Sequence, residues 1–243
     1  MKERIAAIFT NLDRWRHLPN YQLERRTDIF FSIYLKSLAE EFSGVELLDI
    51  IIPELPIKVD GSSRSFKVDY VLFSKDRKTA FFIELKTDSA SRRDEQDEYL
   101  RTAVAGGLEK VLLDLKEIAG KTVSYRKYGH LFRMLAAAEV IRVPKVLNDF
   151  LYPKIKPGLR ACIEKIEVLP NNTAIRVIYV QPATSCYEKS RKPDGAIEDC
   201  IDFDFIIKHL KRCDDGFSSA FAAHLERWKQ AAGDDAPESY ASI

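Results

Sequence analysis

The sequence predicts an α/β protein of the α+β kind, with helices flanking a mixed central sheet. Runs rich in β-branched and aromatic residues lie between long segments of helical periodicity, and turn residues separate the two kinds of segment. The chain has 243 residues, of which 46% are hydrophobic, which is enough for a sizeable core. We therefore expect one domain over residues 1–232, with a core at about 21–181, helical additions at 1–18 and 199–232, and a disordered tail at 233–243.

Two helices are expected before the first strand. Apolar residues recur at helical spacing over Glu3–Trp15, and Pro19 follows that segment. A second apolar stripe runs through Tyr21–Phe42 and is interrupted only at its N-terminal end, by Glu24 and Asp28. Because two carboxylates on a core-facing stripe are unusual, we expect this helix end to approach something that requires charge.

Three strand-like runs follow, at 46–52, 66–73 and 79–85, and Pro53 and Pro56 are expected to end the first. The last two predict a hairpin with a two-residue turn at Asp76-Arg77, so residues equally distant from that turn pair with each other. This register sets Asp69 directly opposite Glu84. It also sets Lys67 opposite Lys86 and leaves the other face of the hairpin apolar.

A long helix should follow the hairpin and extend to about Ile118. Ser91 and Asp94 resemble a capping box at its start, and its buried stripe is polar only at Gln96. The rest of the chain is expected to form a helix, two strands and two helices, at 125–140, 162–169, 174–181, 201–210 and 217–229.

Composition limits the possible functions. The net charge is +1, from 38 basic and 37 acidic residues, so no overall positive field favours nucleic acid and any such signal must come from a local site. The sequence has neither 18 consecutive apolar residues nor a signal-peptide pattern, so we expect a cytoplasmic protein without a membrane partner. The four cysteines lack zinc-ligand spacing and are expected to be structural thiols.

The opposed carboxylates of Asp69 and Glu84 carry the main chemical signal. Such a pair repels unless a cation lies between its members, and hard oxygen ligands without nearby Cys or His suit Mg²⁺ or Mn²⁺. Lys86 follows Glu84 by two residues, on the same face, where it can donate to a phosphate oxygen or to an attacking water. The alternative interpretation is a solvated sheet face with a surface salt bridge.

The segments Phe66-Lys67-Val68-Asp69 and Phe81-Phe82-Ile83-Glu84-Leu85-Lys86 resemble the motif of the PD-(D/E)XK nuclease superfamily. The resemblance implies a restriction-endonuclease-like core of order α-β-β-β-α-β. It also implies that Asp69 and Glu84 ligate the metal and that Lys86 positions the nucleophilic water.

Two further positions are similar to features of this superfamily. Glu24 matches an acidic residue that many members carry on the first core helix, and the resemblance implies a third metal ligand there. Gln96 and Tyr99 are similar to a Gln/Tyr pair in the helicase-associated exonuclease branch, with a spacing one residue shorter. Gln96 is therefore added to the expected catalytic set.

The function implied is metal-dependent hydrolysis of phosphodiester bonds, with DNA as the expected substrate and partner. A non-catalytic nucleic-acid-binding or protein-interaction module on the same fold is the alternative, and a nuclease that works with a partner subunit or as a homodimer is a third. The intact set of Asp69, Glu84 and Lys86 favours the enzyme, because a binding module has no physical reason to keep two carboxylates opposed.

Overall fold

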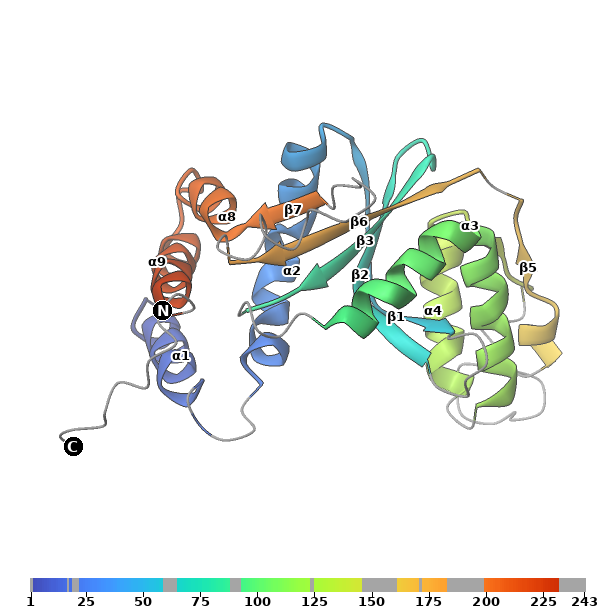
Figure 1. Cartoon of the computed structure of the whole chain (residues 1–243), viewed down its shortest axis with the longest axis horizontal. Helices are drawn as coiled ribbons and strands as arrows, with labels where there is room; N and C mark the ends of the chain where they lie inside the picture. The colour runs from blue at the N-terminus through green and yellow to red at the C-terminus, as the bar shows by residue number, and fades with distance from the viewer. Residues whose placement is uncertain are drawn as a thin grey trace. The chain divides into compact units, whose positions relative to one another are not determined.

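The computed structural model describes residues 2–16, 18, 22–58, 65–87, 93–122, 125–145, 161–170, 172–182 and 199–231. They form a mixed α/β structure with a five-stranded sheet, which confirms the predicted class at this level (Figure 1). The expected tail at 233–243 and the expected capping residue Ser91 lie outside the described residues. Within those residues, no helix combines the length and the apolar character needed to cross a membrane.

The elements follow the predicted order closely. Their bounds are α1 (Lys2–Trp15), α2 (Leu23–Ser43), β1 (Leu47–Lys58), β2 (Ser65–Ser74), β3 (Thr79–Leu85), α3 (Asp94–Lys121), α4 (Tyr125–Ala137), β4 (Ile141–Arg142), β5 (Glu167–Val168), β6 (Ala174–Gln181), β7 (Asp199–Asp202), α8 (Phe203–Leu210) and α9 (Gly216–Ala231).

The sheet is mixed, with strand order β1-β2-β3-β6-β7. The pairs β1/β2 and β2/β3 are antiparallel, and β6/β7 is parallel. Between β3 and β6, the Ala174 amide donates to the Lys78 carbonyl at 2.8 Å and the Lys86 amide donates to the Val180 carbonyl at 2.7 Å. Because both strands advance together between these two bonds, β3 and β6 are parallel.

The chain divides into two compact units. Unit 1 comprises Met1–Phe42, Leu85–Arg92 and Ile178–Ile243, and unit 2 comprises Ser43–Glu84 and Arg93–Val177. The single domain expected over residues 1–232 stays a prediction.

In unit 2, the β2/β3 hairpin has the predicted register. Tyr70 pairs with Ile83 and Phe73 with Ala80, so partners are equally distant from Asp76-Arg77. The turn is longer than predicted, because β2 ends at Ser74 and β3 begins at Thr79, which leaves a four-residue connection. Asp76 stabilises this connection by accepting from the Ser74 hydroxyl at 2.6 Å and from the Lys78 amide at 3.0 Å.

The predicted end of the first strand at Pro53 is wrong. Strand β1 continues to Lys58, with Pro53 opposite Tyr70 and Pro56 opposite Lys67. It is the edge strand of the sheet, so a proline that cannot donate a ladder hydrogen bond is tolerated there. Edge position depends on the tertiary fold and has no local sequence signal.

Helices α3 and α4 lie side by side in unit 2, and both pack on β1 (Figure 1). Helix α3 begins at Asp94 with Arg93 as an N-cap that provides no side-chain hydrogen bond. Gly107 kinks the helix at φ 76° and ψ 166°, a left-handed conformation that glycine adopts most readily. On either side of the kink, the predicted positions Leu100 and Val111 are buried.

Two later predictions are also corrected. Residues 161–164 are helical and only Glu167–Val168 forms a strand, where a continuous strand over 162–169 was expected. The helix expected to begin at Ile201 instead starts at Phe203, because Asp199–Asp202 extends the sheet as β7. Asp202 then caps α8 by accepting from the Phe205 amide at 2.7 Å.

Unit 1 has an aromatic core formed by its helices. The ring of Phe221 in α9 lies 5.0 Å from Phe31 in α2 and 5.7 Å from Phe9 in α1. Helix α9 packs on both α1 and α8, as Figure 1 shows with the blue and orange-red helices. These apolar contacts account for the helical additions predicted at the two ends of the sequence.

The cysteines depart from the prediction at one position. Cys162 and Cys213 are free, as expected, whereas Cys200 in β7 is in a disulfide, so the expectation of a structural thiol is wrong there.

Candidate functional site

The boundary between the two units passes between Glu84 and Leu85, so Asp69 and Glu84 belong to unit 2 and Lys86 belongs to unit 1. In unit 2, the hairpin register that pairs Tyr70 with Ile83 sets Asp69 opposite Glu84 when it is extended by one residue. Asp69 is partly exposed, whereas Glu84 is fully buried. A buried carboxylate requires hydrogen bonds or a cation.

One such hydrogen bond comes from the first turn of α3. The Gln96 side-chain amide donates to Oε2 of Glu84. The predicted orientation of Gln96 toward Glu84 is therefore confirmed, while its role in catalysis stays a prediction. Because the amide fixes one carboxylate oxygen, Glu84 has little freedom to change rotamer.

Tyr99, one turn further along α3, lies within electrostatic reach of both carboxylates. Its ring is buried and stacks on Phe66 of β2, with centroids 4.3 Å apart and planes inclined by 13°. Burial raises the pKa of Tyr99 well above its usual range, the negative charges of Glu84 and Asp69 raise it further, and a hydrogen bond with Gln96 opposes the shift. The phenol therefore stays protonated at neutral pH.

The stacking partner of Tyr99 has no signal in the sequence. The sequence pattern places Phe66 in a strand but does not indicate its partner, because contacts between a strand and a distant helix leave no local periodicity. The stack holds the start of β2 against α3, and Asp69 lies in this same part of β2.

In unit 1, Lys86 pairs with Glu24 of α2. The lysine is only 4% exposed, and its Nζ lies 3.8 Å from Oε2 of Glu24, whose side chain is 30% exposed. A buried ammonium requires an anionic partner, and Glu24 provides one. Glu24 thus has a contact that explains its charge without a metal, and its expected role as a metal ligand stays a prediction.

The other carboxylate of this helix end, Asp28, has a local role. Its Oδ1 accepts from the Ile29 amide at 2.6 Å. The stripe at this end of α2 is also slightly rotated from the predicted one, because Leu23 and Thr27 are the buried residues there.

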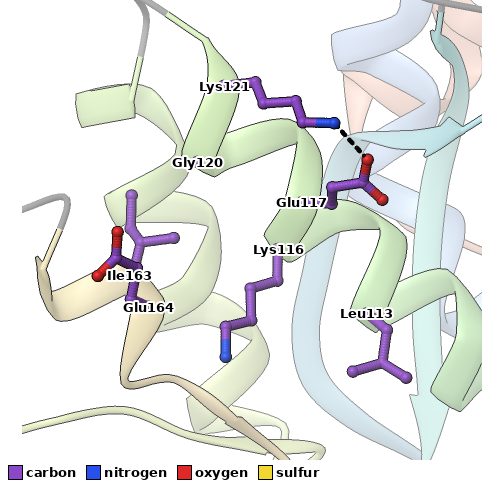
Figure 2. Close-up of a pocket in the computed structure, with 7 residues that line it drawn as sticks. All are labelled: Leu113, Lys116, Glu117, Gly120, Lys121, Ile163 and Glu164. Atoms are coloured by element: carbon purple, nitrogen blue, oxygen red, sulfur yellow. Dashed lines mark hydrogen bonds and ion pairs between the residues drawn. The ribbon is translucent and has the colours of Figure 1, made fainter.

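Unit 2 also has an open hollow of about 380 Å³, remote in sequence from the motif (Figure 2). Its lining residues are Leu113, Lys116, Glu117, Gly120, Lys121, Ile163 and Glu164. Hydrogen bonds from Lys121 and Lys58 lower the pKa of Glu117 to about 2, and Lys116 donates to the Ile166 carbonyl at 2.8 Å. These charges are engaged in structural contacts, and no sequence motif marks this surface.

Across the described ranges, no group of three or more His, Cys, Asp and Glu side chains could hold a metal ion. Comparison with models of protein families, with curated proteins and with solved structures finds no match to this chain. The resemblance of the motif to PD-(D/E)XK nucleases therefore rests on the residues quoted above.

Proposed function

We propose that this protein is a Mg²⁺-dependent phosphodiesterase that hydrolyses DNA, with a restriction-endonuclease-like core. The observation that carries the proposal is the hydrogen bond from Gln96 to the buried Glu84, together with a hairpin register that would pair Asp69 with Glu84 one residue beyond the Tyr70–Ile83 pair. Repulsion between two such carboxylates disfavours the pair unless a cation joins it.

The donor set fits Mg²⁺ better than an ion that needs a complete protein cage. Mg²⁺ usually keeps several waters and takes one or two carboxylates together with substrate phosphates, so Asp69 and Glu84 suffice as protein ligands. When bound, the metal polarises a phosphate oxygen and lowers the pKa of a coordinated water.

The remaining residues act through position and charge. Gln96 holds the Glu84 carboxylate in one orientation, and the protonated Tyr99 supports Gln96. Lys86 lies two residues beyond Glu84 in an extended segment, and this spacing directs both side chains to the same side of the chain. Its ammonium group would stabilise negative charge that develops on the phosphate during hydrolysis.

The test is conversion of supercoiled plasmid to nicked or linear forms with Mg²⁺ or Mn²⁺. We expect cleavage by the wild type, none with a chelator, and a loss of at least about 100-fold in Asp69→Asn, in line with losing a metal ligand. Glu95→Gln is the matched control, because Glu95 is exposed in the same helical turn as Gln96. Absence of cleavage with any divalent metal, together with binding of DNA, would instead favour the non-catalytic module.

A further inference from the structure

Lys67 lies on the same side of β2 as Asp69, two residues before it. The two Cα atoms are therefore separated by about 7 Å along the strand. The side chain of Lys67 is 56% exposed, so its ammonium group is accessible to a ligand in solution. Phe66 next to it stacks on Tyr99, which anchors this part of the strand to α3.

The partner of Lys67 is Glu54 from the edge strand. Pro53 pairs with Tyr70 and Leu55 with Val68, so Glu54 stands opposite Asp69 in the β1/β2 ladder. The Lys67 ammonium forms an ion pair with Oε2 of Glu54, whose side chain is 61% exposed. Lys67 thus lies diagonally across from Glu54 on the face that carries Asp69.

The backbone of Glu54 is unusual. Its φ is 56°, in the left-handed region that residues with a Cβ atom rarely adopt, and this conformation occurs inside a strand. Backbone outliers of this kind gather at functional sites and persist where the surrounding structure imposes them. Here the outlier coincides with the residue that neutralises the lysine nearest to Asp69 along β2.

We propose that Lys67 binds a backbone phosphate of the DNA next to the bond that is cut, and that Glu54 is the internal competitor that holds Lys67 until phosphate replaces it. This inference rests on the proposed function, because it assumes that the ligand bound next to Asp69 is a DNA strand. An ion pair between exposed groups changes an equilibrium constant by at most about fivefold, so a phosphate can displace Glu54 readily. Lys67 is a positioning residue and takes no part in bond breaking.

The test is fluorescence anisotropy of a labelled DNA duplex, titrated with protein at several KCl concentrations. Ca²⁺ replaces Mg²⁺, because it also takes oxygen ligands. One lost phosphate contact should reduce the slope of log Kd against log salt by about 0.9 in Lys67→Gln and raise Kd at low salt. Lys75→Gln is the matched control, since Lys75 is 57% exposed and pairs with Glu46 at 3.3 Å, beyond the other end of β2; it should leave the slope nearly unchanged.

Glu54→Gln should change the Kd for DNA in the opposite direction to Lys67→Gln. It should tighten binding by up to about fivefold, because it removes the competitor of the phosphate while keeping side-chain size. In the double variant with Lys67→Gln this gain should vanish, since Glu54 acts through Lys67. A gain that persists in the double variant would indicate general charge repulsion by Glu54 and would overturn the proposal, as would equal salt slopes for Lys67→Gln and Lys75→Gln.

The binding and cleavage results separate the two proposals. Cleavage of plasmid by a wild type whose DNA affinity is insensitive to Lys67→Gln overturns the role of Lys67 and leaves the nuclease proposal standing. A Lys67-dependent salt slope without cleavage under any metal supports the phosphate contact and overturns the nuclease proposal. No binding of the duplex by the wild type, even at low salt, overturns the phosphate contact.

Discussion

Lys86 is a buried lysine with a charge partner, a combination that few lysines have a structural reason to adopt. Its side chain is almost completely buried, yet it keeps a charge partner, Glu24, at 3.8 Å. Burying an ammonium group is costly, and a purely structural position would be filled as well by an apolar residue of similar length. This cost favours a role for the charge itself, and the proposed role is in the transition state.

We therefore expect Lys86→Met to remove hydrolysis and leave metal binding nearly unchanged. Methionine keeps the apolar stem, and the loss of one donor to developing negative charge should lower the rate by about 100–1,000-fold. The affinity for Mn²⁺, measured by calorimetry, should stay within about twofold, because an effect confined to the transition state changes rate and not ground-state binding. Plasmid cleavage measures the rate, and a thermal melt checks the fold.

A variant that cuts DNA at the wild-type rate would remove Lys86 from the mechanism. A parallel loss of Mn²⁺ affinity would show instead that the Lys86–Glu24 pair organises the metal ligands.

At the scale of single residues, sequence reasoning succeeded where local geometry determines the outcome. Alternation along two adjacent strands fixes which residues face each other, and the Tyr70–Ile83 pairing agrees with the register expected for Asp69 and Glu84. The position of Gln96 was also predictable, because it is the polar end of an apolar helical stripe. The stack of Tyr99 on Phe66 was not predictable, since it depends on how α3 crosses the sheet.

At the scale of elements, α1 and α9 are joined by a partly buried polar contact as well as by aromatic packing. Asp13 in α1 accepts from Trp228 Nε1 at 2.6 Å, and its other oxygen lies 2.8 Å from Nδ1 of His224, both in α9. Burial alone would raise the pKa of Asp13, but the hydrogen bonds from His224 and Trp228 outweigh it and lower that pKa. Burial lowers the pKa of His224, and the hydrogen bond to Asp13 opposes this shift.

This contact should make the pairing of α1 with α9 sensitive to acid. A histidine whose pKa is lowered by folding binds its proton more readily in the unfolded chain, so its contribution is complete above pH 6.5 and is lost as pH falls toward its folded pKa. Asp13 adds a second loss of folding stability as the pH falls below 3.8, its ordinary pKa, because folding also lowers the pKa of Asp13. The free energy of unfolding should therefore fall from pH 7 to pH 5 mainly through His224.

The measurement is urea unfolding of the wild type and His224→Gln across this pH range. The advantage of the wild type over the variant should shrink as the solution becomes more acidic. His130→Gln, at an exposed position in α4, is the control and should follow the wild type. An advantage that grows on acidification would mean that a protonated His224 stabilises the fold through attraction to Asp13.

Errors in the predicted elements share a physical cause. Pro53 and Pro56 were read as strand breakers, yet β1 tolerates them because it is an edge strand, and edge status is set by the final sheet order. Ile201 was assigned to a helix because its apolar neighbours continue into α8, whereas the structure pairs it with Val180 of β6. In both cases a tertiary pairing decided the conformation of a locally ambiguous segment.

At the scale of the whole molecule, the net charge is only +1, so no overall positive field attracts DNA to the protein. Under the proposed function, DNA binding should depend on a few local cations and on the metal, and each phosphate contact should contribute measurably to the salt dependence. Under the proposed function, the Asp69–Glu84 pair should destabilise the folded chain without a cation and stabilise it with one.

Thermal stability should therefore respond to Asp69→Asn with opposite signs in the two conditions. Without metal, the variant should melt at a higher temperature than the wild type, because neutralising Asp69 relieves its repulsion with Glu84. With Mn²⁺ at about 100 times its Kd, linkage adds about 2.7 kcal/mol to the wild type, which for a chain of this size is about 5–10 °C in Tm. Asp69→Asn should gain much less stability from Mn²⁺, so the order of the two melting temperatures reverses.

Melts followed by circular dichroism, with a chelator and with Mn²⁺, measure this reversal directly, and the melting temperature of Glu95→Gln should shift as that of the wild type does. A variant that is less stable in both conditions would show that Asp69 makes a structural salt bridge, since only a vacant site for a cation produces the reversal.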